Sequence, residues 1–137
     1  MEILEVSTID EWKKMIEEKP IVIVDYWAAW CRPCQMLGRW MHEIQEDMGD
    51  KYKDITVVKV NTELPALVPL AQELQITSIP TMMIFLGGRQ LMFGDPSGEL
   101  SNDRIMGALP KKNLEGLFDA LLQEYAKLME EAIATTQ

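Results

Sequence analysis

The order of apolar and polar residues predicts a helix and then a buried strand near the N-terminus. Large apolar side chains recur at helical spacing in this first helix: Trp12, Met15 and Ile16. Thr8 and Glu11 stand at capping-box spacing before the stripe, and Pro20 ends it. The next segment, IVIVDYW over Ile21–Trp27, is a continuous β-branched and aromatic run. Such a run is typical of a strand covered by helices on both faces, so the pattern predicts a layered α/β fold.

The middle of the chain repeats this alternation of helix and strand. After Cys34, an apolar stripe predicts an amphipathic helix that ends near Gly49. The stripe consists of Met36, Leu37, Trp40, Met41, Ile44 and Met48. Residues 55–61 (ITVVKVN) predict a second buried strand, and residues 65–76 a short helix. The inward residues of that helix are Leu67, Leu70, Ala71 and Leu74. A strand, helix, strand order requires parallel pairing of the two strands through a right-handed crossover.

The last third of the chain predicts a hairpin and a long helix. Thr81–Leu86 reads as a strand, Gly87 and Gly88 as a tight turn, and a returning strand begins near Arg89. This hairpin is antiparallel, so the sheet is mixed. Gly94–Asp103 is rich in turn-forming residues and predicts a surface loop or a lengthened hairpin tip. The final helix, to about Ala134, carries an apolar stripe of Leu114, Leu117, Phe118, Leu121, Leu122, Tyr125, Leu128 and Met129.

Composition narrows the class of protein. A chain of 137 residues with 47% hydrophobic residues suits one domain, residues 1–137. A net charge of −9 argues against nucleic acid or an anionic membrane as the main partner. The N-terminus has two early glutamates and no basic start of a secretory signal, which predicts a soluble cytoplasmic protein. A secreted protein whose leader had been removed would look the same, so a periplasmic location stays open.

Both cysteines of the chain, Cys31 and Cys34, lie in the stretch AAWCRPCQM. Zinc needs four Cys or His ligands, and the single histidine, His42, lies on the polar face of its helix. Covalent haem needs histidine after the second cysteine, where Gln35 stands. A static disulfide over so short a loop removes little entropy from the unfolded chain. Dithiol redox chemistry remains, favoured by a helix start that stabilises a thiolate, and it requires neither metal nor bound cofactor.

Four segments in order resemble the signature segments of thioredoxins. They are VDYWAAWCRPC (residues 24–34), VVKVN (57–61), SIPT (78–81) and GAL (107–109). The resemblance covers about Ile3 to Leu122. It implies a thioredoxin fold, an α/β architecture with a central mixed β-sheet of four to five strands flanked by four helices. It also implies that the dithiol lies at the start of the second helix.

The resemblance assigns catalytic roles residue by residue. Cys31, nearer the surface, resembles the attacking thiol that forms a mixed disulfide with a client protein, and Cys34 the resolving thiol. Asp25, which interrupts an apolar run, resembles the buried carboxylate that accepts the proton of the resolving cysteine. Lys59 resembles the lysine that pairs with this aspartate. If it is unpaired, Asp25 should hold its proton to a higher pH than usual.

The same resemblance assigns a surface for client proteins beside the dithiol. Pro80 matches the family's cis-proline, and the backbone of Ile79 is expected to pair with an extended client segment. The flat apolar surface that accepts this segment consists of Trp30, Ile79, Gly107 and Ala108. Arg32 and Pro33, between the two cysteines, are assigned to the same contact surface. Arg32 departs from the family, which usually has glycine there, and Arg39 replaces a usual proline.

These features predict a general protein disulfide reductase that is a monomer. Its expected partners are an electron donor similar to thioredoxin reductase and client proteins that carry disulfides. One alternative is an oxidant or isomerase outside the cytoplasm, which differs in reduction potential. The other is a thioredoxin-like binding module whose dithiol is idle and whose interaction surface is the loop Gly94–Asp103.

Overall fold

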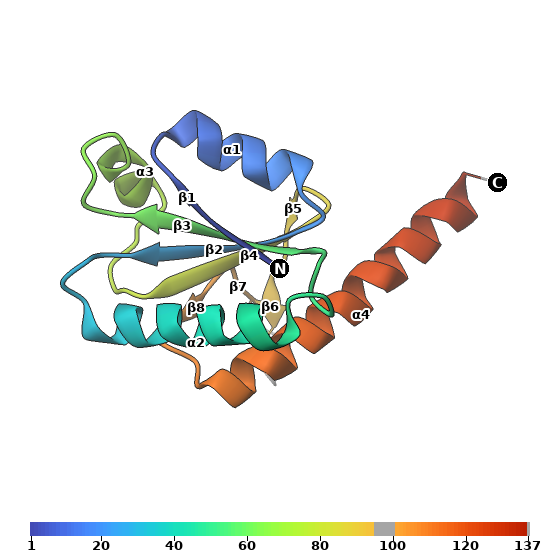
Figure 1. The fold of residues 1–137 in the computed structure, drawn as a ribbon. Helices are drawn as coiled ribbons and strands as arrows, with labels where there is room; N and C mark the ends of the chain where they lie inside the picture. Colours follow the sequence, from blue (N-terminus) through green and yellow to red (C-terminus); the bar gives the residue numbers. More distant parts are fainter. Residues whose placement is uncertain (95–100, 137) are drawn as a thin grey trace.

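The apolar runs become the central strands of a mixed β-sheet. The computed structural model describes residues 1–94 and 101–136 (Figure 1). Its elements are β1 (Glu2–Val6), α1 (Ile9–Glu18), β2 (Ile21–Trp27), α2 (Arg32–Met48), β3 (Ile55–Asn61), α3 (Val68–Glu73), β4 (Thr81–Leu86), β5 (Arg89–Gln90), β6 (Phe93–Gly94), β7 (Ser101–Asn102), β8 (Ile105–Met106) and α4 (Lys111–Thr135). None of the helices in the described ranges is long and apolar enough to cross a membrane.

The sheet has the order β1-β3-β2-β4-β5, and β8 also pairs with β4. Strands β2 and β3 are parallel, as the alternation of strand and helix predicts, β1 is also parallel to β3, and β4 runs antiparallel to β2. The four longer strands carry the sheet, and the two-residue strands β5 and β8 extend it. The sequence pattern missed β1, because its residues EILEV mix glutamates with apolar residues and only Val6 is buried.

Helices cover both faces of the sheet, which explains the continuous apolar run of β2. Figure 1 shows α1 and α3 on one face and α2 and α4 on the other. Successive side chains of a strand point to opposite faces. Ile21 and Ile23 therefore pack in one core with residues of α2 and α4, while Val22 and Val24 pack in a second core with residues of α1 and α3.

Helix α1 and the two-glycine turn form as the sequence predicts. The side chain of Thr8 accepts a hydrogen bond from the backbone amide of Glu11 at 3.1 Å, which caps α1. Gly87 and Gly88 adopt φ angles of 58° and 82°, in the left-handed region that glycine tolerates best. Together they return the chain from β4 to β5.

The expected lengthened hairpin is present at its base. Phe93 pairs with Asn102, and Gly94 with Ser101, so β6 and β7 form a separate antiparallel ribbon. The rest of the predicted loop Gly94–Asp103, residues 95–100, lies outside the described residues. Strands β6 and β7 therefore add a short β-ribbon between β5 and β8.

Two apolar stripes bury fewer residues than their periodicity predicts. Met36 on α2 is 45% exposed, because it lies about 100° around the helix from the buried Leu37. On α4, the fully buried residues end at Leu121, and Leu128 and Met129 are exposed. Figure 1 shows the C-terminal half of α4 extending beyond the sheet, so no described element covers the end of the stripe.

We expect removal of residues 127–137 to change the free energy of unfolding by less than about 1 kcal/mol, because the side chains of residues 127–136 are exposed. The matched control is Phe118→Ala in the same helix. Phe118 is fully buried and packs edge-on against Tyr52, so its truncation should cost about 3–5 kcal/mol. Urea unfolding followed by circular dichroism measures both values. A loss of several kcal/mol in the shortened chain would show that the end of α4 stabilises the fold.

Candidate active site

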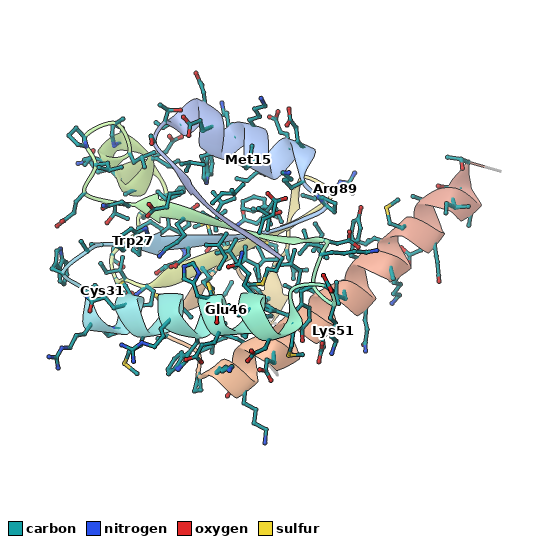
Figure 2. The ribbon with its side chains drawn as sticks, viewed as in Figure 1. Met15, Trp27, Cys31, Glu46, Lys51 and Arg89 are labelled. Carbon is teal, nitrogen blue, oxygen red and sulfur yellow. A yellow bond between two sulfur atoms is a disulfide. The ribbon has the colours of Figure 1, made fainter. Side chains whose placement is uncertain are left out.

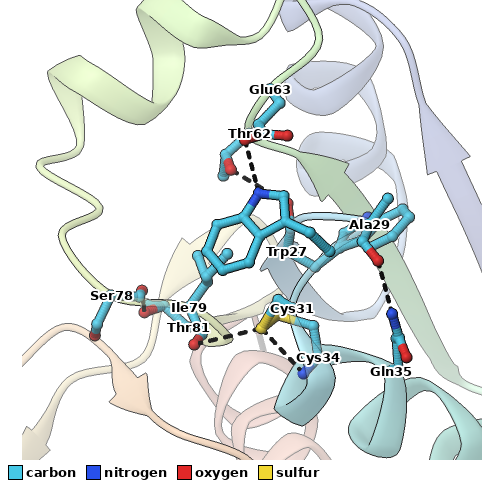
Figure 3. Close-up of a disulfide and its surroundings, with 11 residues drawn as sticks. Trp27, Ala29, Cys31, Cys34, Gln35, Thr62, Glu63, Ser78, Ile79 and Thr81 are labelled. Carbon is cyan, nitrogen blue, oxygen red and sulfur yellow. Dashed lines mark hydrogen bonds between the residues drawn. A yellow bond between two sulfur atoms is a disulfide. The ribbon is translucent and has the colours of Figure 1, made fainter.

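The two cysteines form a disulfide at the start of α2. Figure 2 shows Cys31 at the carboxyl end of β2, the same end of the sheet as Trp27. Cys31 is the N-cap of α2, and its sulfur accepts a hydrogen bond from the backbone amide of Cys34 at 3.2 Å (Figure 3). The Cα atoms of the two cysteines are 5.2 Å apart. Unpaired amides and the helix dipole make this position electropositive, which favours a thiolate after reduction.

Access to the disulfide is restricted. Cys31 is 3% exposed and Cys34 is 1% exposed, so the expected difference in accessibility between them is small. The residues around them are open: Trp30 is 68% exposed, and Arg32 and Pro33 in the first turn of α2 are also exposed. Exposed side chains thus surround a cysteine pair that is itself almost completely buried.

Asp25 lies beneath this helix in the centre of β2. Ile21 and Ile23 face α2, and the alternation of the strand places the side chain of Asp25 on the same face. Asp25 has no exposed surface, and neither carboxylate oxygen has a hydrogen-bond partner among the described residues. Burial raises the pKa of Asp25 from 3.8 to about 7, although the positive charge of Lys59 acts to lower it.

Lys59 lies beside Asp25 but does not form a contact ion pair with it. The two residues are opposite each other in the pairing of β2 with β3. The Lys59 ammonium instead lies 4.3 Å from the centre of the Trp27 ring, in a cation–π contact. Lys59 and Asp25, which the resemblance expects to pair, thus interact through their charges at a distance and not through a direct contact. The lysine favours the ionised form of Asp25 without satisfying its hydrogen bonds.

Gly38 of α2 lies over Lys59. A Cβ atom at Gly38 would lie 3.4 Å from the Lys59 ammonium nitrogen, which is an ordinary van der Waals distance. Sequence reasoning missed Gly38, because a single glycine inside a helical pattern gives no indication of its tertiary neighbour.

The loop before β4 supplies the other side of the site. The peptide bond between Ile79 and Pro80 is cis, as the resemblance predicts. The carbonyl oxygen of Ile79 lies 3.8 Å from the Cys31 sulfur (Figure 3). Gly107, with a φ of 94°, donates its backbone N–H to the Pro80 carbonyl at 2.8 Å. Ala108 is half-buried and packs against the core, so it offers less open surface than expected.

Glu63 is a further residue of the site that sequence reasoning missed. The Trp30 indole N–H donates a hydrogen bond to the Glu63 carboxylate at 2.7 Å. Glu63 follows β3, and its backbone amide bonds to the side chain of Asn61, so the loop around it is ordered by local contacts. The interaction holds the most exposed aromatic ring beside Cys31 in one orientation. No motif in the sequence distinguishes Glu63 from the other acidic residues.

Comparison with known proteins identifies similar chains. The sequence model of the family described as Thioredoxin matches residues 3–111. A thioredoxin of Griffithsia pacifica is 38% identical over 114 residues, which cover 83% of this chain and 90% of that protein. A thioredoxin of Mycolicibacterium smegmatis is 40% identical over 101 residues, 73% of this chain and 78% of that protein.

Solved structures show the same fold. The thioredoxin of Plasmodium falciparum matches with a TM-score of 0.65 at 23% identity, covering 88% of this chain and 98% of that one. The thioredoxin of Malassezia sympodialis also matches with a TM-score of 0.65 at 23% identity, covering 88% and 93%.

The buried carboxyl group leads to a pH-dependent stability. Because the pKa of Asp25 is raised in the folded state, the folded protein binds the proton more tightly than the unfolded chain does. Stability should therefore fall as the pH rises from 4 to 7 and level off above 7. A rise of the pKa from 3.8 to about 7 corresponds to about 4 kcal/mol at most.

Urea unfolding of the oxidised protein and of Asp25→Asn at pH 4.5, 6 and 8 tests this expectation. The difference in unfolding free energy between the two proteins should shift in favour of the variant as the pH rises. Parallel pH profiles for the two proteins would show that Asp25 does not titrate in this range.

Proposed function

The chain belongs to the thioredoxin family and is a thiol-disulfide oxidoreductase, and we propose that it acts as a general reductase of protein disulfides through Cys31 and Cys34. The observation that carries this proposal is the Cys31–Cys34 disulfide at the N-terminus of α2, next to the Ile79 backbone. Members of this family are generally reduced by thioredoxin reductase and act on disulfides of client proteins. In our proposal, the electron donor of this chain is an enzyme similar to thioredoxin reductase, and its clients are proteins that carry disulfides.

In the proposed reaction the reduced protein gives two electrons to a client disulfide. The Cys31 thiolate attacks one client sulfur, the client S–S bond breaks, and the second client sulfur leaves as a thiolate. Cys34 then loses its proton and attacks the Cys31 sulfur of the mixed disulfide. The client leaves with two thiols, and the Cys31–Cys34 disulfide forms. The donor returns two electrons and two protons to this disulfide in each cycle.

Asp25 is proposed as the acceptor of the Cys34 proton. A carboxyl group with a pKa of about 7 can take up and release a proton near neutral pH, which is where a general base works best. Burial causes this property, and the position of Asp25 on the α2 face of β2 places it on the side of the dithiol. Lys59 is proposed to limit the rise of the Asp25 pKa, because its charge favours the carboxylate.

Client binding is proposed on the surface around Cys31. An extended client segment pairs with the backbone at Ile79, as an added strand beside cis-Pro80, and its side chains contact Trp30 and Gly107. Exposure of Trp30 supports this role, as does the short distance from Ile79 to Cys31. Arg32, Pro33 and Ala108 complete the proposed surface. We also propose that the chain works as a monomeric single domain in the cytoplasm.

The reduction of insulin disulfides by dithiothreitol, with and without the protein, tests the proposed function. A reductase accelerates the precipitation of the insulin chains, whereas an idle dithiol gives the rate of dithiothreitol alone. The reduction potential separates the remaining alternative: about −270 mV fits a reductase, and about −120 mV an extracytoplasmic oxidant.

The two cysteines should behave differently when replaced. Cys31→Ser removes the attacking sulfur and should abolish turnover. Cys34→Ser retains attack but cannot resolve the mixed disulfide, so the variant should accumulate a covalent adduct with the client. Non-reducing electrophoresis and mass spectrometry measure the adduct. An adduct on Cys34 in the Cys31→Ser variant, with none on Cys31 in the Cys34→Ser variant, would reverse the assignment.

Arg32 should make the disulfide slightly more oxidising than glycine would. Arg32 is the first residue of α2, and its positive charge near the helix start favours the Cys31 thiolate, which exists only in the reduced state. Solvent screens an exposed charge, so Arg32→Gly should lower the potential by no more than about 20 mV. Equilibration of both proteins with glutathione gives the values. An unchanged potential combined with altered client preference would make Arg32 a client-contact residue alone.

A further inference from the structure

Arg104 connects two segments that are far apart in the sequence. It stands just before β8, and its side chain is 19% exposed. The guanidinium donates hydrogen bonds to the backbone carbonyl of Leu74 at 2.8 Å and to that of Gln75 at 3.0 Å. These carbonyls lie at the C-terminal end of α3, where the helix leaves backbone acceptors without partners of its own.

The neighbouring carboxylate fixes the orientation of this guanidinium. Asp103 accepts from Arg104 Nε at 2.7 Å and from Nη2 at 3.1 Å, which is a two-point contact. The Arg104 guanidinium hydrogen bond is the main reason why the pKa of Asp103 is lowered. The Asp103 carbonyl in turn accepts from the side chain of Gln90 on β5 at 2.9 Å. Arg104 is therefore anchored to the hairpin before it reaches α3.

The segment that Arg104 holds leads directly to the client-binding loop. After α3 the chain turns at Gln75, whose φ is 54°, and no regular element follows until β4 begins at Thr81. Ile79 lies in this interval, 3.8 Å from the Cys31 sulfur through its carbonyl oxygen. The Ile76 amide donates to the Ala71 carbonyl at 2.9 Å and the Thr81 hydroxyl to the Ser78 carbonyl at 2.6 Å, and contacts with residues 104–107 add to these bonds.

Residues 104–107 supply contacts at both ends. Arg104 binds the start of the loop, at Leu74 and Gln75. Gly107 donates to the Pro80 carbonyl at 2.8 Å, and Met106 pairs with Thr81, which fixes the end of the loop. Residues 104–107 thus contact the loop between α3 and β4 at its start and at its end.

We infer that Arg104 is a positioning residue for client binding, which holds the Ile79 backbone ready to pair with an extended client segment. This inference rests on the proposed function of the dithiol. Without the guanidinium the loop samples more conformations, and a client must then order it on binding. Loss of the guanidinium therefore weakens the binding of extended protein clients. A small disulfide that reacts with Cys31 without strand pairing is unaffected.

Steady-state kinetics of Arg104→Met tests the inference. With insulin as the client and dithiothreitol as the donor, we expect KM to rise about five- to tenfold and kcat to stay unchanged, as for the loss of one to two backbone hydrogen bonds. The rate constant of the reduced protein with the small disulfide 5,5′-dithiobis(2-nitrobenzoate) and the reduction potential should equal those of the wild type. Arg104→Lys should recover part of the KM effect, because an ammonium can bind the carbonyls but cannot reproduce the fork.

Arg89→Met serves as the matched control. This exposed arginine lies on β5, and Figure 2 shows it at the end of the sheet away from Cys31, so its KM should equal that of the wild type. An unchanged KM in Arg104→Met would overturn the inference. Equal losses with insulin and with the small disulfide would also overturn it, because they indicate general disruption. Failure of the wild type to reduce insulin would instead refute the proposed function.

Discussion

Burial of β2 on both faces is the constraint on which the rest of the structure depends. All seven of its residues pair with β3 on one side, the first six pair with β4 on the other, and helices cover both faces. Alternation along the strand then assigns every side chain to one of the two faces of the sheet. At its carboxyl end the strand passes the chain to α2, so the start of that helix, with Cys31, meets the loop that carries Ile79.

The same burial gives the site its chemistry. A carboxyl group in the middle of such a strand cannot be solvated, and Asp25 has no hydrogen-bond partner among the described residues. The cost of charging it raises its pKa to about 7 and reduces the stability of the fold at neutral pH. Lys59 offsets part of this cost from a position over Trp27. Two sulfurs at an electropositive helix end and a carboxyl group that titrates near neutrality suit thiol-disulfide exchange.

Much of this arrangement could be predicted from the sequence, for identifiable reasons. The runs of β2 and β3, the cap at Thr8 and the cysteine pair are local patterns with local physical causes. Burial was predicted less well, since periodicity says which residues share a face but not what covers it. Met129 is exposed for this reason, whereas Met36 is exposed because it lies to one side of the buried face of α2. The contacts of Glu63 and Arg104 join residues 33 and 30 positions apart and exist only after the sheet has assembled.

In the proposed function, Cys31 and Cys34 transfer two electrons as a pair to a client disulfide. The most direct measurement mixes the reduced protein with insulin in the absence of any other reductant, stops the reaction with acid and labels the remaining thiols for mass spectrometry. One insulin disulfide should be lost for each Cys31–Cys34 disulfide that forms. Insulin that keeps its disulfides while both cysteines stay reduced would contradict the proposed function.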